Sequence, residues 1–305
     1  MNDSLSDYPY IDRLRSVIAN RFPYFKGTID RQVDEFGAEW MRAFDRDMAV
    51  HFAGDFSRFD KAVEGYGRFA LEAMKLQVAF DKTREYEAKT YEEAAQEVYQ
   101  NEDYMLEMYL PGILLSHFLW RHHYKQHIFF EEKFAPFVRN HGGRNFYDVG
   151  IGTGFYSKEM LGLTPDMRGR GFDLSPFSKK YTLNTIQAFG YADRYDVILR
   201  DITEATDIPP APFIVNIEVL EHLEQPQVFL NALNKMLEKG GFGLISAALT
   251  APNADHIYLY NDPQEVVDQL ERAGFDVIEQ IEDPAYEPKS PDKSVPRNAA
   301  FIVTK

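Results

Sequence analysis

The sequence predicts an α/β protein in which a mostly parallel sheet follows an all-helical N-terminal region. Three observations predict this class. Strand-like and helix-like segments alternate after residue 145, a glycine-rich turn separates the first strand from its helix, and the first 140 residues carry apolar side chains at helical spacing. With 45% hydrophobic and 14% aromatic residues among 305, the chain can bury a substantial core.

Helical spacing dominates the first half. Val33, Phe36, Trp40 and Phe44 recur every three or four positions with acidic residues between them, and similar patterns follow. A capping box is indicated at Thr90, three residues before a glutamate. The expected helices cover residues 29–52, 56–80, 91–109 and 113–139, with a break at Pro111-Gly112.

A turn at residues 140–144 marks the predicted domain boundary. Residues 1–140 are expected to form a helical cap or substrate lid, and residues 141–305 the α/β domain. A helical region before such a core can serve as a lid or as a dimerisation module, and the sequence leaves both open.

The second half alternates strands and helices, which indicates βαβ units and a parallel sheet covered on both faces. The expected strands are 146–149, 168–174, 192–199, 211–218, 241–249, 276–282 and 299–304. The expected helices are 155–163, 176–188, 226–237 and 262–273.

The turn after the first strand contains Gly150, Gly152 and Gly154 and leads directly into a helix. Glycines allow a tight turn with exposed N–H groups, so a ligand can approach the backbone at the helix N-terminus. An ordinary turn is the alternative interpretation of this segment alone.

Aspartates stand at three strand ends and support the ligand interpretation. Asp148 precedes the glycines, Asp173 ends the second strand and Asp201 ends the third. In a dinucleotide fold, an acid at the end of the second strand accepts hydrogen bonds from ribose hydroxyls, which fits Asp173. Asp201 follows along the same edge, where the base of a nucleoside would lie.

These features together resemble the class I S-adenosylmethionine-dependent methyltransferases over residues 140–305. The resemblance rests on Asp148-Val-Gly-Ile-Gly-Thr-Gly154, Asp173, Asp201-Ile202 and Asn216-Ile-Glu-Val-Leu-Glu-His-Leu223. Phe155 stands where a nicotinamide-binding fingerprint requires its third glycine. The resemblance implies a Rossmann-like, seven-stranded sheet with an antiparallel ending, and S-adenosylmethionine as the cofactor.

The resemblance also implies roles for single residues. The backbone around residues 150–154 would hold the methionine portion of the cofactor, with Asp148 near its amino group and Asp173 on its ribose. Asp201 and the backbone of Ile202 would meet adenine.

Two residues after the fourth strand complete the implied cofactor site. Asn216 and Glu218 would face the methionine end or the substrate. Glu221, in the same stretch, is expected to support the structure rather than the chemistry.

Methyl transfer is a displacement at an activated sulfonium, so the protein mainly supplies alignment, and a base is needed only for a protonated acceptor. The candidate catalytic residues are His123, Tyr156, His222 and His256. The wider set of candidate bases also includes His127, Tyr109 and Tyr258.

A metal site is not expected. His123 and His127 share a helix face with Glu131, and such spacing can hold a divalent ion, but no further ligand is evident. The chain also lacks cysteine, which excludes disulfides, thiolate metal sites and cysteine nucleophiles.

Charge and composition restrict the partners. With 48 acidic and 33 basic residues, the net charge is −15, which disfavours a nucleic-acid substrate. The polar N-terminus does not resemble a signal peptide, and the apolar run near residues 110–120 is too short to span a bilayer, so a cytoplasmic protein is expected. A small amino acid or natural-product amine fits the acidic surface best, and a homodimer through the cap is possible.

Two other functions stay open. Azetidine-2-carboxylate synthases resemble this family and carry a helical cap; they cyclise S-adenosylmethionine and release methylthioadenosine. The third possibility is a non-catalytic, cofactor-binding interaction protein.

Overall fold

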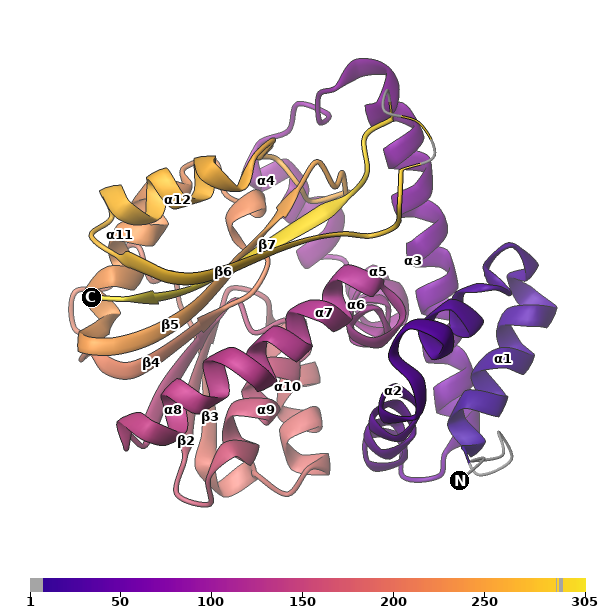
Figure 1. Ribbon diagram of the computed structural model, residues 1–305, viewed down its shortest axis with the longest axis horizontal. Coiled ribbons are helices and arrows are strands. Elements are labelled where there is room, and N and C mark those ends of the chain that lie inside the picture. The colour runs from indigo at the N-terminus through magenta and orange to yellow at the C-terminus, as the bar shows by residue number, and fades with distance from the viewer. Residues whose placement is uncertain (1–7, 289, 291–292) are drawn as a thin grey trace.

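The computed structural model describes residues 8–288, 290 and 293–305, and these form a sheet in the order β3-β2-β1-β4-β5-β7-β6 (Figure 1). Strands β1 to β5 pair in parallel, whereas β7 is antiparallel to both β5 and β6. The predicted seven-stranded, mostly parallel sheet is confirmed. The strands are β1 (Asn145–Val149), β2 (Arg168–Asp173), β3 (Tyr195–Leu199), β4 (Ala211–Asn216), β5 (Leu237–Leu249), β6 (Asp276–Pro284) and β7 (Arg297–Thr304).

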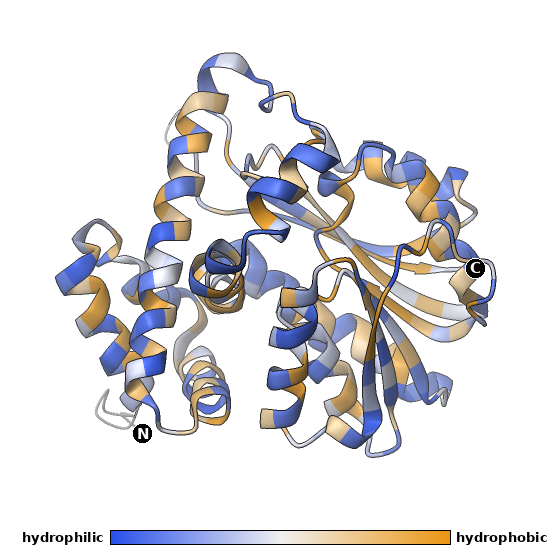
Figure 2. Ribbon diagram, turned by 180° about the vertical axis from the view of Figure 1, so that it is seen from behind, coloured by the Kyte–Doolittle hydropathy of each residue, from blue (hydrophilic) through white to orange (hydrophobic). Residues whose placement is uncertain are grey.

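Helices cover both faces of the sheet, as its hydrophobic strands require. One buried cluster joins the sheet to helices α11 and α12, and another joins the opposite face to α9, α10 and the N-terminal helices. In Figure 2 the strands show orange, white and blue segments, and the helices around the sheet carry both hydrophobic and hydrophilic residues, as amphipathic helices on a sheet do. The core helices are α9 (Phe155–Leu163), α10 (Pro176–Ala188), α11 (Pro226–Met236) and α12 (Pro263–Arg272).

The region before residue 142 is helical, as predicted. The expected helices at 29–52 and 56–80 correspond to α2 and α3, and the capping box at Thr90 is present. Helix α1 was not predicted from the sequence. The helices are α1 (Pro9–Arg21), α2 (Thr28–Phe52), α3 (Phe56–Thr83), α4 (Tyr91–Ala94), α5 (Glu102–Tyr104), α6 (Leu110–Leu119), α7 (Arg121–Phe129) and α8 (Ala135–His141), with wide π-type turns at Ala95–Tyr99, Met105–Tyr109 and Phe130–Phe134.

Three predictions in this region are wrong. Pro111 and Gly112 do not break the chain; they lie in the first turn of α6, where proline loses no helical hydrogen bond. The expected helix 113–139 is instead interrupted at Trp120, whose backbone is extended with φ −97° and ψ 123°. The helix 91–109 is also divided, because Asn101 is extended and caps α5 with its side chain.

Helices α7 and α8 pack on the sheet rather than on the other N-terminal helices alone. Helix α7 contacts β6 and β7, and α8 contacts β5 and α9. The domain boundary at residues 140/141 stays a prediction. Residues 1–7, which carry most of the polar N-terminus discussed above, lie outside the described residues. Among the residues that are described, no helix is long and apolar enough to cross a membrane.

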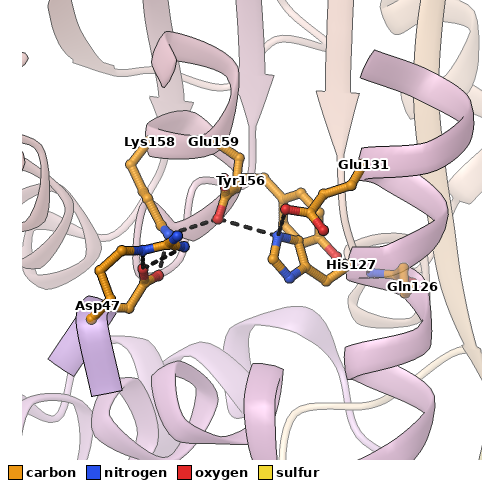
Figure 3. Close-up of polar contacts among 8 residues, drawn as sticks. Asp47, Gln126, His127, Glu131, Tyr156, Lys158 and Glu159 are labelled. Atoms are coloured by element: carbon orange, nitrogen blue, oxygen red, sulfur yellow. Dashed lines mark hydrogen bonds and ion pairs between the residues drawn. The ribbon is translucent and has the colours of Figure 1, made fainter. Parts of the chain in front are cut away.

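A buried ion-pair network joins the N-terminal helices to the core (Figure 3). Lys158 of α9 contacts the carboxylate of Asp47 on α2, and its Nζ lies 2.6 Å from Glu159. The side chains of Lys158 and Asp47 are only 6% and 5% exposed. His127 of α7 adds a contact of 3.2 Å from its Nε2 to Glu159. Elements α2, α7 and α9 therefore meet at one charged junction.

Removing the lysine from this junction should destabilise the protein strongly. Lys158→Met leaves the Asp47 and Glu159 carboxylates buried without their cation, which should lower the free energy of unfolding by about 3–5 kcal/mol in urea titrations. The control is Arg170→Met, which breaks a pair with Asp196 whose side chains are 42% and 56% exposed. That variant should lose no more than about 1 kcal/mol. Equal losses in the two variants would contradict a structural role for the junction.

Candidate functional site

One cavity of about 1540 Å³ lies between the carboxyl edge of the sheet and the N-terminal helices. Parallel strands end at the same edge of a sheet, so residues that follow β1, β2, β3 and β4 meet there. The opposite wall comes from α2, α3, α6 and α7 and from the segment between α4 and α6. The aromatic residues that line the cavity include Tyr66, Phe69, Tyr99, Tyr109 and Trp120 on this wall and Tyr156 of α9.

The glycine turn lies against this cavity with a backbone that other residues rarely adopt. The φ angles of Gly150, Gly152 and Gly154 are 78°, 50° and 74°. A Cβ atom on Gly150 would stand 2.3 Å from Cγ2 of Val219, so glycine is required for packing there. A Cβ on Gly152 would meet no protein atom within 4 Å, so this residue faces open space. The turn thus leaves room for a ligand directly against its backbone.

Asp173 and Asp201 line the same cavity beside the glycine turn. The Asp173 carboxylate accepts a hydrogen bond of 2.8 Å from the backbone N–H of Ser175. Burial raises the pKa of Asp173 to about 6, although backbone N–H groups of Ser175 and Gly152 oppose that shift. Asp201 is exposed and forms a local turn through the N–H and hydroxyl of Thr203. Buried Ile202 follows it and also lines the cavity.

Asp148 is buried at the end of β1, where its carboxylate accepts a short hydrogen bond from the Ser157 hydroxyl. Ser157 in turn lies 2.6 Å from the Tyr195 hydroxyl. Burial raises the pKa of Asp148 to about 7, with the Ser157 hydrogen bond opposing the shift and the charge of Asp173 adding to it. Asp148 lines the cavity, but its carboxylate is tied to α9.

Two predicted site residues, Gly154 and Asn216, do not line the cavity. A Cβ atom on Gly154 would stand 2.8 Å from Cγ2 of Thr182, so this glycine packs against α10. Asn216 is the last residue of β4. It is fully buried, and its Nδ2 donates a hydrogen bond of 2.8 Å to the Val149 carbonyl. This bond connects the ends of β4 and β1 and holds the glycine turn in register. The structure therefore places Asn216 as a support of the turn.

Glu218 and His123 form a pair across the cavity, with Glu218 on the β4 loop and His123 on α7. His123 Nε2 lies 3.2 Å from Glu218 Oε2, and its Nδ1 lies 3.0 Å from the Ser116 hydroxyl. Because Ser116 donates its proton to the Ile113 carbonyl, Nδ1 of His123 must donate to Ser116. Both ring nitrogens are engaged, so His123 acts as a fixed partner of Glu218.

The pair leaves one oxygen of Glu218 available. Burial alone would raise the pKa of Glu218, but the charge and hydrogen bond of His123 outweigh it and lower the pKa to about 2. Glu218 Oε1 is buried and has no hydrogen-bond partner among the described residues. The backbone of Glu218 has φ 52°, an uncommon value for a non-glycine residue. The Glu218 carboxylate is thus held as an anion at the cavity wall, and its Oε1 can still accept a hydrogen bond from a ligand.

Tyr156 is buried at the first turn of α9 and lines the cavity. Its hydroxyl accepts a hydrogen bond of 3.2 Å from Nε2 of Gln126, whose Oε1 accepts one of 3.1 Å from Asn298. Burial raises the pKa of Tyr156, so the hydroxyl keeps its proton at neutral pH. The residue is held firmly as a neutral hydroxyl.

His222 and His256 stand side by side against the cavity, with ring centroids 4.8 Å apart. His222 follows β4 and contacts the buried Asp255 carboxylate at 3.3 Å. Burial alone would lower the pKa of His222, but the charges of Asp255 and Glu221 raise it. His256 follows β5; burial and the neighbouring His222 lower its pKa to about 4, so it is neutral.

Three residues near this pair, Tyr99, Asp255 and Glu221, were not among the predicted site residues. Asp255 is fully buried and accepts hydrogen bonds of 2.8 Å from Tyr99 and 2.7 Å from Tyr109. Glu221 was expected only to support the structure, yet burial raises its pKa to about 8 and it lines the cavity. Asp255 and His256 are adjacent in the sequence. No sequence pattern connects Asp255 to Tyr99, which lies 156 positions before it.

The predicted neighbours His123 and His127 point to different partners. His127 contacts Glu131 at 3.7 Å and Glu159 at 3.2 Å, whereas His123 contacts Glu218. The residue set His123, His127 and Glu131 therefore does not form a common ligand group.

Comparison with known proteins identifies the core. Residues 147–245 match the sequence model of a family described as a methyltransferase domain. The solved structure of PigF with S-adenosylhomocysteine (SAH) is 16% identical to this chain in sequence, with a TM-score of 0.53 over 79% of this chain and 73% of its own. The N-methyltransferase NodS from Bradyrhizobium japonicum, in complex with S-adenosylhomocysteine, is 19% identical, with a TM-score of 0.51 over 68% of this chain and 97% of its own. No curated protein matches the sequence.

Filling the open space at Gly152 should block ligand binding. Gly152→Ala places a methyl group where no protein atom lies within 4 Å, next to the turn backbone. We expect calorimetric titration to show at least a tenfold loss of affinity for S-adenosylhomocysteine. Gly190→Ala is the matched control, because Gly190 also has a positive φ (78°) and open space but does not line the cavity. Equal affinities in the two variants would show that the ligand does not approach Gly152.

Asp148 should make the ligand-free protein less stable as the pH rises. Its pKa is about 7 when folded against an ordinary 3.8, so between these values the folded protein binds more protons than the unfolded chain. Stability should therefore fall between about pH 4 and pH 7, by roughly 4 kcal/mol at most from this group. Asp148→Asn keeps an acceptor for Ser157 and should flatten the fall in urea titrations, whereas the exposed-site variant Asp196→Asn should not. An unchanged slope in Asp148→Asn would refute the assignment.

Proposed function

We propose that this chain, whose core is a class I S-adenosylmethionine-dependent methyltransferase domain, transfers a methyl group to a small molecule. The observation that carries the proposal is the single cavity that runs from the glycine turn to the aromatic, histidine-bearing wall of the N-terminal helices. Cofactor and acceptor can lie in contact there, which is the main requirement of an in-line displacement.

The residues at the sheet edge fit the cofactor. Gly152 offers its backbone to open space, Asp173 offers a carboxylate beside it, and Asp201 and Ile202 follow along the edge. When bound, S-adenosylmethionine supplies an activated methyl group on a sulfonium. Asp173 would hold the ribose hydroxyls, and Ile202 would lie against adenine. Asp148 would keep the first turn of α9 in place through Ser157.

The contact between the β4 loop and α7 supports a small, positively charged acceptor. Glu218 presents Oε1 without a partner, and His123 holds the other carboxylate oxygen in place. An ammonium group would satisfy this buried acceptor, which otherwise lowers stability. Aromatic side chains such as Trp120 and Tyr109 complete a wall suited to a compact amine or amino acid. The N-terminal helices would act as the substrate lid.

The four candidate catalytic groups differ in what they can do. His123 has both ring nitrogens engaged and positions Glu218, while Tyr156 is held as a neutral hydroxyl that can orient an acceptor. His222 and His256 are the imidazoles placed to receive a proton from a protonated acceptor or to bind a ligand atom. Their Nδ1 atoms face the carbonyls of Asp255 and Ala251, which leaves Nε2 of each ring for this role.

A second function has one observation in its favour. The same unfilled carboxylate oxygen of Glu218 can meet the α-amine of S-adenosylmethionine itself, and the cavity is covered by the N-terminal helices. This arrangement suits an azetidine-2-carboxylate synthase type of cyclisation, in which the α-amine attacks the γ-carbon and methylthioadenosine leaves. A cofactor-binding interaction protein that dimerises through the cap is the non-enzymatic alternative.

Product analysis separates these functions. We expect S-adenosylhomocysteine to form only when a small amine or amino acid is added to the protein and S-adenosylmethionine, as followed by mass spectrometry. Methylthioadenosine without any acceptor would replace methyl transfer by cyclisation. Tight binding with neither product, over a broad panel of amines, would favour the interaction protein.

Asp173→Ala tests the cofactor site independently of the acceptor. Loss of the carboxylate removes the ribose acceptor and should weaken S-adenosylhomocysteine binding by tenfold or more in calorimetry. Asp196→Ala, in neighbouring β3 and more than half exposed, should bind as the unmodified protein does. Unchanged affinity in Asp173→Ala would exclude the proposed placement of the ribose.

A further inference from the structure

Glu221, His222 and His256 bring three metal-ligating side chains together at one wall of the cavity. Glu221 and His222 lie in the 3₁₀ turn Leu220–His222 after β4, and His256 lies in the loop after β5. One ligand atom from each residue lies within 4.8 Å of the other two, and all three residues line the cavity. Two imidazoles and one carboxylate form a ligand set that transition metals commonly use.

Glu221 lacks a partner that its burial demands. Its side chain is fully buried, and neither carboxylate oxygen has a well-formed hydrogen bond among the described residues. The backbone N–H groups of Glu221 and Ala248 approach it, but they offset little of the rise in pKa that burial causes. An unsatisfied buried carboxyl group costs stability unless a cation or donor reaches it. The neighbouring imidazoles place two nitrogen ligands beside those free oxygens.

Hydrogen bonds fix both imidazoles in the orientation that metal ligation needs. His256 Nδ1 lies 2.6 Å from the Ala251 carbonyl and must donate to it, which leaves the lone pair on Nε2. His222 Nδ1 faces the Asp255 carbonyl at 3.1 Å and the Tyr99 hydroxyl at 3.0 Å. Because Tyr99 donates its proton to Asp255, its oxygen accepts from His222. Histidines that bind metals usually donate their second nitrogen to a carbonyl or carboxylate in this way.

We propose that Glu221, His222 and His256 bind a divalent transition metal ion, with a coordination position open to the cavity. The proposal departs from the sequence-based expectation of no metal, because the expected ligands His123 and His127 do not converge whereas these three residues do. It stands apart from methyl transfer, since metal binding can be measured without cofactor or turnover.

A second group, His127, Glu131 and Glu159, has similar spacing and provides an internal control (Figure 3). There Glu159 is already paired with Lys158 at 2.6 Å, and the Glu131 side chain is 57% exposed. The positive charge of Lys158 opposes a second cation at the same carboxylate. This group should therefore bind metal poorly despite its composition.

The test titrates Co²⁺ into chelator-treated protein and follows visible absorption, with Zn²⁺ added afterwards as a competitor. We expect one Co²⁺ per chain, visible absorption typical of nitrogen and oxygen ligands, and displacement by Zn²⁺. Glu221→Gln and His256→Gln should each weaken binding by tenfold or more, as ligand loss does. His127→Gln should leave the affinity unchanged.

Circular dichroism and urea titration establish that each variant is folded. Absence of Co²⁺ binding to the unmodified protein would overturn the proposal, as would binding that Glu221→Gln and His256→Gln leave intact. Loss of binding in His127→Gln alone would assign the ion to the control group instead. If metal binds but no methyl product forms, the metal site stands and the proposed function fails.

Discussion

Four carboxylates, two buried and two half-buried, surround one cavity and form the constraint on which the site depends. Asp148, Asp173, Glu218 and Glu221 all line it, and the charge of one raises the pKa of the next in the pairs Asp148–Asp173 and Glu221–Glu218. Buried like charges repel strongly, so each must be protonated, hydrogen-bonded or matched by a cation. A ligand with a sulfonium and an ammonium group would place positive charge beside these carboxylates.

The break at Trp120 determines which side chains of the N-terminal helices face the cavity. A continuous helix over residues 113–139 would keep His117 and His123 on one straight axis. The extended backbone at Trp120 instead turns α7 toward the sheet, and His123 reaches Glu218 while Gln126 reaches Tyr156. The aromatic and histidine side chains of this segment thereby become a wall of the cavity rather than a helix surface.

The sheet and the glycine turn were predictable because their signals are local. Alternating hydrophobic strands and helices, the spacing of the glycines and the position of Asp173 at a strand end are all written in short segments. The contacts of Asp255 with Tyr99 and Tyr109 depend on packing between distant segments, and no periodicity reports them. The same limit explains the error at Pro111, where a residue that usually breaks helices occupies the first turn of one.

The buried ion-pair network around Lys158 and the wall of the cavity differ in the cations that face their carboxylates. At the junction, Lys158 binds Asp47 and Glu159 with a charge that ordinary pH changes do not remove. A fixed cation makes a stable joint between α2 and α9. At the cavity wall, Glu218 instead faces the His123 imidazole at 3.2 Å, and burial raises the pKa of Glu221 more than the charge of His222 lowers it. Glu218 Oε1 and both carboxylate oxygens of Glu221 have no well-formed hydrogen bond among the described residues, so these atoms stay available to an ammonium group or a metal ion.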